Sequence, residues 1–426
     1  MWSSVLLLVV AATTDTALDL SQLPDDAALS AYVWAHAPAL QATRARVAAA
    51  RAEADKAHLL PNPALDLSAN TLPIGPLNPA DLQQPWANVP NYNFGLSVLL
   101  EVGKRGPRQD ALREAARATA LDALEEVRQR TLALEDVVGD VAAAEVRVAT
   151  LEHLVEDAAR LTLLQRARAD KGDTSALDAD RAQLEQEGTL TALADAREAV
   201  AEGLRLCGEQ LGVPCLPFAS KEKAARFLAR RVDFGAADVT ARPDLRALEA
   251  AEASARFSQT LASRHALPDP TLRVGYVHDR FVISGNQQNS LYVGLSFPLP
   301  FFDHGQTDAR AAEVAAAAAA STRQRLASSA RDQLQRVDTQ LATVEERQKR
   351  LKEQSLPLAE SVVARLETAV NRGAAPVQEL LLARRTRAEI LLTQNDLDRA
   401  ALHLQVEKAR LTGAGVPLPD EVTDAP

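Results

Sequence analysis

Aromatic residues make up only 4% of this 426-residue chain, which has just 2 cysteines and 1 methionine. Basic residues are fewer than acidic ones, 47 against 57, and the net charge is -10. This balance argues against nucleic acid as a partner, because phosphate binding needs a basic face. The sequence also offers no run of the roughly 20 apolar residues that a membrane-spanning helix requires. Alanine supplies much of the 47% hydrophobic content, and such a composition favours long helices packed at close range.

The usual signatures of enzymes and metal sites are missing as well. The seven histidines show no pairing at helical spacing, and the cysteines form no CxxC motif, so no zinc site is predicted. There is no GxSxG, Walker A or GxGxxG motif. Carboxylates occur at i, i+4 spacing, as in Glu125 with Gln129 or Glu345 with Lys349, which is typical of solvated helix faces. We therefore predict neither an enzyme nor a cofactor.

Two features concern the compartment of the protein. Ser3 to Ala12 is a short apolar run followed by small residues. It resembles a secretory signal without the usual basic start, and cleavage is expected after Ala12 or Ala17. Cys207 and Cys215 are eight residues apart, and an oxidising compartment could join them in a disulfide. The alternative is two inert thiols.

The chain contains two copies of one pattern, as a search for internal repeats shows. Leu60 to Leu65 (LPNPAL) reappears as Leu267 to Leu272 (LPDPTL), at an offset of 207. Three further matches follow in the same order with slightly different offsets, which indicates duplication with changes in loop length. They pair Gly95-Leu96-Ser97 with Gly294-Leu295-Ser296, Asp170-Lys171-Gly172 with Asn371-Arg372-Gly373, and Gly212-Val213-Pro214 with Gly415-Val416-Pro417.

Each copy is expected to contain a helix, two strands, a very long helix, a glycine turn and a medium helix. After a signal peptide at 1–17, the first repeat covers 18–218, with a first helix over 28–60, strands at about 63–70 and 91–100, and helices 106–170 and 175–211. A linker or equatorial segment, 219–242, precedes the second repeat, 243–418. That repeat has strands at about 271–278 and 289–297, a long helix 305–371 broken near 357, a helix 376–411, and then a tail, 419–426.

The expected strands alternate between apolar and polar residues, so each has one apolar and one polar face. Aromatic residues, scarce elsewhere, gather in and near them, for example Trp86, Phe94 and Tyr292. Strand length and aromatic placement are typical of outer-membrane barrels, but four strands cannot close a barrel. Several chains would each have to contribute four strands. The alternative is a soluble antiparallel sheet packed on helices.

In each copy, the long helix is about as long as the two shorter helices laid end to end, so the three helices would form a rod of constant thickness. From Gly106 to Asp170 there is no proline after Pro107, and at 1.5 Å per residue this rod is roughly 100 Å long. The two shorter helices of the first copy, laid end to end, match that length. Pro357 lies inside the second long helix, where proline costs about 3 kcal/mol, and we expect a kink or break there.

The residues at the junction between the strand and the long helix resemble those of a known family. Glu101 to Arg108 (EVGKRGPR), its counterpart Phe297 to Gln306 (FPLPFFDHGQ) and Leu60 to Pro63 resemble the outer-membrane factors. These are the TolC-like exit ducts of efflux pumps, and the heavy-metal (cobalt, zinc, cadmium) branch is the most similar. The resemblance implies a mainly α fold with four strands per chain, in which long antiparallel α-helical hairpins form a periplasmic α-barrel and three chains share a 12-strand transmembrane β-barrel.

The same resemblance implies the function and the partners. A homotrimer in the lipid of the outer membrane would pass heavy-metal cations or drugs from an inner-membrane pump of the RND type, through a periplasmic adaptor (membrane fusion) protein, to the exterior. The two glycine turns would be the periplasmic tips that contact the adaptor, and Asp178 and Glu379 are candidates for an acidic constriction. The tip residues are Asp170, Lys171, Gly172, Asp173, Thr174, Asn371, Arg372, Gly373 and Ala374. The alternatives are a periplasmic adaptor and a soluble coiled-coil scaffold.

Overall fold

The structure, a computed structural model, describes residues 17–23, 26–74, 83–230, 238–281 and 287–413. The expected signal peptide, apart from Ala17, and the tail at 419–426 lie outside the described residues, as does 231–237 of the linker. The chain divides into two compact units. Unit 1 comprises 1–45, 121–246 and 325–424, and unit 2 comprises 46–120, 247–324 and 425–426.

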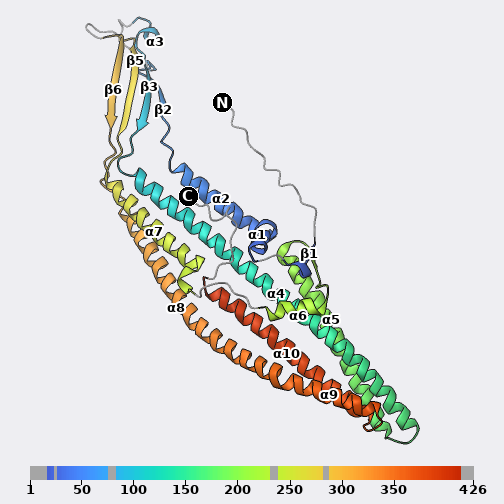
Figure 1. Cartoon of the computed structure of the whole chain (residues 1–426). Helices are drawn as coiled ribbons and strands as arrows, with labels where there is room; N and C mark the ends of the chain where they lie inside the picture. Colours follow the sequence, from blue (N-terminus) through green and yellow to red (C-terminus); the bar gives the residue numbers. More distant parts are fainter. Residues whose placement is uncertain (1–16, 24–25, 75–82, 231–237, 282–286, 414–426) are drawn as a thin grey trace. The chain divides into compact units, whose positions relative to one another are not determined.

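Unit 2 contains a four-stranded antiparallel sheet (Figure 1). Its strands lie side by side in the order β2 (Ala64–Asn70), β3 (Asn91–Leu99), β5 (Thr271–Asp279) and β6 (Asn289–Ser296). The central pair, β3 with β5, joins the two halves of the sequence repeat through nine paired positions from Asn91↔Asp279 to Leu99↔Thr271. The duplicated strand pairs therefore form one continuous sheet.

The junctions of the sheet with the helices of unit 2 are fixed by charged side chains. Asp269, just before β5, accepts hydrogen bonds from the Val102 backbone N–H at 2.9 Å and from Lys104 Nζ at 2.8 Å. Arg108 forms an ion pair with Glu101. The contacts of Asp269 tie the segment after β3 to the segment before β5. The helices of this unit are parts of α7 (Pro243–Ser263), α2 (Gln41–Lys56), α4 (Arg105–Asp170) and α8 (Gln306–Arg350), with the short α3 (Pro85–Asn88) between β2 and β3.

Unit 1 is built around two helical hairpins. The first joins the distal part of α4 to α5 (Ala176–Leu211), and the second joins α9 (Leu356–Asn371) to α10 (Val377–Leu411). The unit also contains α1 (Asp26–His36), α6 (Lys221–Ala229) and a two-stranded parallel sheet of β1 (Leu18–Asp19) and β4 (Cys215–Leu216).

Small residues let the helices of unit 1 approach closely. A Cβ added to Gly203 of α5 would lie 2.6 Å from Cγ2 of Val141 on α4, and one on Gly139 would lie 2.9 Å from Cδ2 of Leu402 on α10. Leu132 of α4 packs with Val406 and Ala409 of α10 in a buried cluster. Bulky residues at the glycine positions would push these helices apart.

The expectation of one helix over 28–60 is wrong. α1 ends at His36, and a short 3₁₀ turn, Pro38–Leu40, separates it from α2, which ends at Lys56. Pro38 has no N–H to donate and disfavours helical backbone at the residue before it. Ala37 accordingly has φ -59° and ψ 117°. The chain therefore turns between two shorter helices.

A π-helical turn, Leu351–Ser355, separates α8 from α9, and Pro357 lies in the first turn of α9. Proline removes the N–H that would bond to the carbonyl four residues earlier. The backbone N–H of Leu356 instead donates to the carbonyl of Leu351, five residues before it. Within the described residues, no helix combines the length and apolar character that crossing a lipid bilayer would demand.

Candidate functional site

The turn between α4 and α5 is exposed, and backbone hydrogen bonds within it cap the C-terminal end of α4. Gly172 has φ +78°, and its N–H donates to the Ala169 carbonyl at 2.9 Å. The N–H of Asp173 donates to the Arg168 carbonyl, also at 2.9 Å. This pair of bonds is a Schellman motif, which requires the left-handed backbone that glycine adopts without strain.

The turn between α9 and α10 has the same construction. Gly373 has φ +69°, and its N–H donates to Val370 at 2.9 Å while the N–H of Ala374 donates to Ala369 at 2.8 Å. A Cβ on either glycine would meet no atom within 4 Å. The backbone conformation, and not crowding, therefore demands glycine at both turns. The nine residues expected at the tips lie in these two turns or, for Asp170 and Asn371, at the last position of the preceding helix, and all but the half-buried Thr174 are exposed.

Asp178 is part of the cap of α5. Its Oδ2 accepts hydrogen bonds from the hydroxyls of Ser175 at 2.7 Å and Thr174 at 3.0 Å, and its N–H donates to Ser175 Oγ at 3.2 Å. The bonds from Ser175 and Thr174 lower the pKa of Asp178. Such reciprocal capping fixes the first turn of a helix. Glu379, the other candidate acid, is exposed in the first turn of α10.

Charged side chains connect the two hairpins of unit 1. Arg168 of α4 donates to Gln378 of α10 at 3.4 Å. Arg384 of α10 bridges Asp157 of α4 at 3.1 Å and Glu367 of α9 at 2.8 Å. A groove of about 410 Å³ lies between α4, α5 and α10, with Leu151, Leu154, Leu161, Leu381, Leu382 and Leu392 among its apolar lining. The sequence did not reveal this groove, because helical periodicity does not say which helices become neighbours.

A second polar network lies farther along the same helices. Asp136 of α4 accepts from Arg399 at 2.7 Å and from His403 at 3.0 Å, both on α10. Burial opposes ionisation of Asp136, but these hydrogen bonds and the charge of Arg399 outweigh it and lower its pKa. Arg399 also pairs with Asp140 at 2.6 Å. These contacts fix the α4–α10 pairing.

The expected solvated position of Glu125 is wrong. Its side chain is only 13% exposed and binds Arg128, which is 1% exposed, through two bonds of 2.8 and 2.9 Å. Arg128 also donates to the carbonyls of Ala409, Arg410 and Thr412 at the end of α10. The i, i+3 spacing of Glu125 and Arg128 resembles a surface pair, but α10 covers it.

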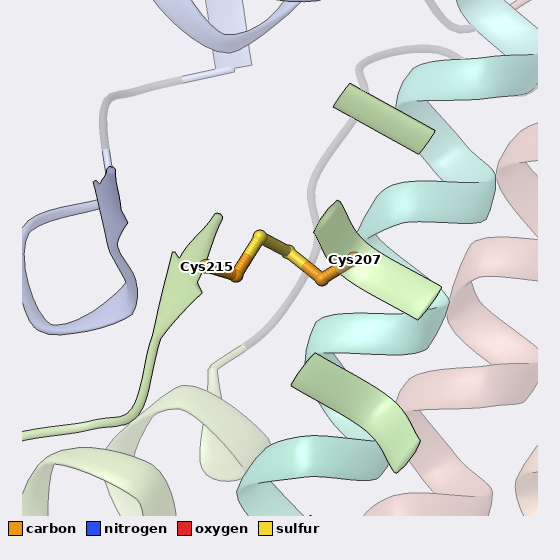
Figure 2. The surroundings of a disulfide bond; sticks show 2 residues. All are labelled: Cys207 and Cys215. Atoms are coloured by element: carbon orange, nitrogen blue, oxygen red, sulfur yellow. A yellow bond between two sulfur atoms is a disulfide. The ribbon is translucent and has the colours of Figure 1, made fainter. Parts of the chain in front are cut away.

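Cys207 and Cys215 form a disulfide (Figure 2). It connects the last turns of α5 to β4, which pairs in parallel with β1. The N–H of Leu18 in β1 donates to the carbonyl of Pro214 at 2.8 Å. The disulfide therefore fixes β4 to the end of α5, and β1 pairs with the fixed β4.

The sheet of unit 2 has two different faces. Apolar side chains on one face are strongly exposed, including Leu291 (82%) and Val293 (74%). Alternate residues on the other face are mostly polar or small, such as Asp66, Asn93 and Ser290. An exposed apolar sheet face of this kind marks a surface that meets lipid or protein. Further exposed apolar side chains on the same face are Leu65, Leu67, Phe94, Leu96, Val274, Tyr276 and Leu295.

The described residues bring no three histidine, cysteine or carboxylate side chains together in an arrangement that could hold a metal ion.

The fold is that of outer-membrane channel proteins. The outer-membrane channel OprN is 19% identical, with a TM-score of 0.69 over 93% of this chain and 92% of that chain. The outer membrane protein VceC of Vibrio cholerae is 16% identical, with a TM-score of 0.70 over 91% and 96%. CusC, which forms a transmembrane channel, is 15% identical, with a TM-score of 0.71 over 94% and 97%. No curated protein matches the chain significantly in sequence.

Residues 31–205 match the sequence profile of the family described as outer membrane efflux protein. Together with the solved channels, this match supports a location in the outer membrane with a large helical part in the periplasm. Both the family and these solved proteins are described as efflux, channel or membrane proteins.

Proposed function

We propose that this chain is one third of an outer-membrane exit duct of a tripartite efflux system. The observation that carries the proposal is the two-faced sheet of unit 2. Its edge strands, β2 and β6, each pair on one side only among the described residues. Unpaired edges are not tolerated in the hydrocarbon region of a membrane, and a barrel removes them. Three copies of four strands would close a 12-strand barrel, with the apolar faces toward lipid and the polar faces toward the bore.

The helices continue this duct as an α-barrel in the periplasm. On this proposal a periplasmic adaptor contacts the two glycine turns and links them to an inner-membrane pump of the RND type. The exposure of both turns and their shared Schellman construction support a common docking role. The bond from Arg168 to Gln378 joins α4 to α10 beside the turns, and we propose that it couples the two hairpins. Asp178 and Glu379 are the proposed acidic constriction, and its opening would release the cargo.

The cargo is proposed to be a heavy-metal cation or an organic drug. The metal branch rests on the resemblance of the junction motifs. Lys104, in one of these motifs, forms an ion pair with Asp269 before β5 at 2.8 Å. These residues hold the sheet to the helices. Export assays with cobalt, zinc and cadmium salts and with organic drugs distinguish the two classes.

The location is tested by membrane fractionation and by electrophoresis of unheated samples. An outer-membrane protein that migrates as a heat-sensitive trimer supports the duct. A periplasmic adaptor would instead fractionate with the inner membrane, and a coiled-coil scaffold would be soluble. Either result would overturn the proposal.

The docking role is tested by Gly172→Leu and Gly373→Leu. A side chain at φ +78° or +69° is strained, at a cost of about 1–2 kcal/mol, and the turn is expected to change shape. Resistance to the cargo should fall while trimers remain in the membrane. Gly106→Leu is the control, because Gly106 is a helix residue with open space around its Cβ position. Full resistance in both turn variants would contradict docking at these turns.

A further inference from the structure

Two glycines are the only buried residues in the four strands of the sheet. Gly95 on β3 and Gly275 on β5 are directly paired, while every other strand residue of this sheet is half-buried or exposed. Glycine in a strand interior weakens the strand and often marks a place where another group approaches closely. Some other group must therefore shield Gly95 and Gly275 from solvent.

The ring of Tyr292 on β6 shields both glycines. Tyr292 is paired with Gly275, and a Cβ on Gly275 would lie 2.6 Å from Cε1 of the tyrosine ring. The hydroxyl of Tyr292 lies against Gly95, and its Cζ is 3.4 Å from the Cβ position there. The ring therefore extends from β6 across β5 to β3 and lies flat on the polar face of the sheet.

This orientation is unusual, because side chains in strands stand roughly perpendicular to the sheet. Only a residue without a side chain on each of the two neighbouring strands leaves room for the ring. The register places Asp66, Gly95, Gly275 and Tyr292 in one row across the four strands. The row thus has an acidic residue at one end and a flat aromatic ring over its centre.

We propose that Tyr292 shapes the bore of the duct, and that Gly95 and Gly275 keep the bore open by holding its ring against the inner wall. The inference rests on the proposed function, in which the polar face of the sheet lines the bore. Three tyrosines standing upright would narrow the barrel at this row. Three rings lying flat on the wall do not reduce the cross-section of the bore, so the transported cargo can pass.

Gly95→Ala is the most selective perturbation. The new Cβ would collide with the hydroxyl end of a flexible side chain, and its next contact is the Val274 carbonyl at 3.3 Å. A Cβ on Gly275 would also lie 2.7 Å from the Phe94 carbonyl and 2.8 Å from Cα of Gly95, which would disturb strand pairing. Gly294→Ala is the matched control, because Gly294 lies two residues along β6 from Tyr292 with no atom within 4 Å of its Cβ position.

The experiment measures single-channel conductance of purified full-length trimers in planar lipid bilayers. Gly95→Ala should lower the conductance, since it lifts the ring into the bore, whereas Gly294→Ala should leave it at the wild-type value. The double variant Gly95→Ala/Tyr292→Ala should recover the lost conductance. Tyr292→Ala alone should change conductance much less than Gly95→Ala, because a flat ring obstructs little.

Unchanged conductance in Gly95→Ala trimers, or a fall that the double variant does not reverse, would overturn the inference. A large rise in Tyr292→Ala would also overturn it, because it would mean that the ring already stands in the bore. This second variant keeps the test decisive if Gly95→Ala fails to assemble. Wild-type protein that forms no pore would refute the proposed function itself, which is a different result.

Discussion

Arg128 is predicted to contribute strongly to the stability of unit 1. It is buried between α4 and the end of α10, and its guanidinium donates to the carbonyls of Ala409 at 2.7 Å, Arg410 at 3.0 Å and Thr412 at 3.2 Å. The last carbonyls of a helix have no partner within the helix. Arg128 therefore satisfies the end of α10 while its own charge is balanced by Glu125.

The size of the effect follows from these contacts. Replacing Arg128 by methionine keeps the helix propensity and the aliphatic stem. It removes the charge that balances Glu125, which retains the bond from Gln129 Nε2 at 2.6 Å, and it takes the guanidinium donor from three carbonyls. Breaking a buried ion pair by removing one partner costs about 3–5 kcal/mol. Because 1.4 kcal/mol corresponds to a factor of ten, the equilibrium for opening the end of α10 should rise on the order of a hundredfold or more.

The assay is amide hydrogen exchange of the segment that ends α10, together with guanidinium unfolding of the protein in detergent. Arg130→Met is the control, because Arg130 is 38% exposed and lies 3.3 Å from Glu126; such a pair contributes about 0–1 kcal/mol. Arg128→Lys should be intermediate, since an ammonium group cannot reproduce the planar fork of arginine. If Arg128→Met loses no more stability than Arg130→Met, the reasoning is refuted.

Two further predictions concern unit 1. The lowered pKa of Asp136 means that the ionised carboxylate stabilises the fold above its unfolded pKa of about 4, and this contribution is lost as the pH falls through the lower folded pKa. Asp136→Asn should thus cost stability at neutral pH, with a smaller difference from wild type in acid, as measured by denaturant midpoints; a pH-independent difference would contradict this. Replacing Cys207 and Cys215 by serine should cost about 2–3 kcal/mol for a loop of this length, and reductant should then lower the melting temperature of wild type but not of the variant.

The strands were the part of the fold most readily predicted from the sequence. The alternation of Asn91 to Leu100 predicts a strand because side chains in a strand point alternately to the two faces, and β3 occupies Asn91–Leu99. Pro357 likewise marks a disturbance of helical hydrogen bonding for a local chemical reason. Pro38 also indicates a break in a helix. The apolar residues on both sides of Pro38 have helical spacing, however, and this spacing predicted one continuous helix in place of α1 and α2.

The relations between elements could not be predicted. Gly95, Gly275 and Tyr292 become neighbours only through the register of three strands, and a single sequence does not fix that register. Arg128 and Glu125 have the spacing of a surface pair, and only the placement of α10 covers them. Local pattern therefore identifies the elements, whereas burial and contact depend on partners distant in the sequence.

The unequal burial of the two long helices bears on the proposed trimer. α4 has many fully buried side chains, among them Val127, Leu132 and Val138, whereas the only buried residues of α8 are Ala316 and Ala330. The sequence repeat gives the two helices corresponding places, so their environments should be similar in the complete assembly. In the proposed closed ring each of them would have neighbours on both sides. The exposed side of α8 is therefore a surface that the proposed ring would cover, and the small alanine side chains of its first half suit close packing against a second copy.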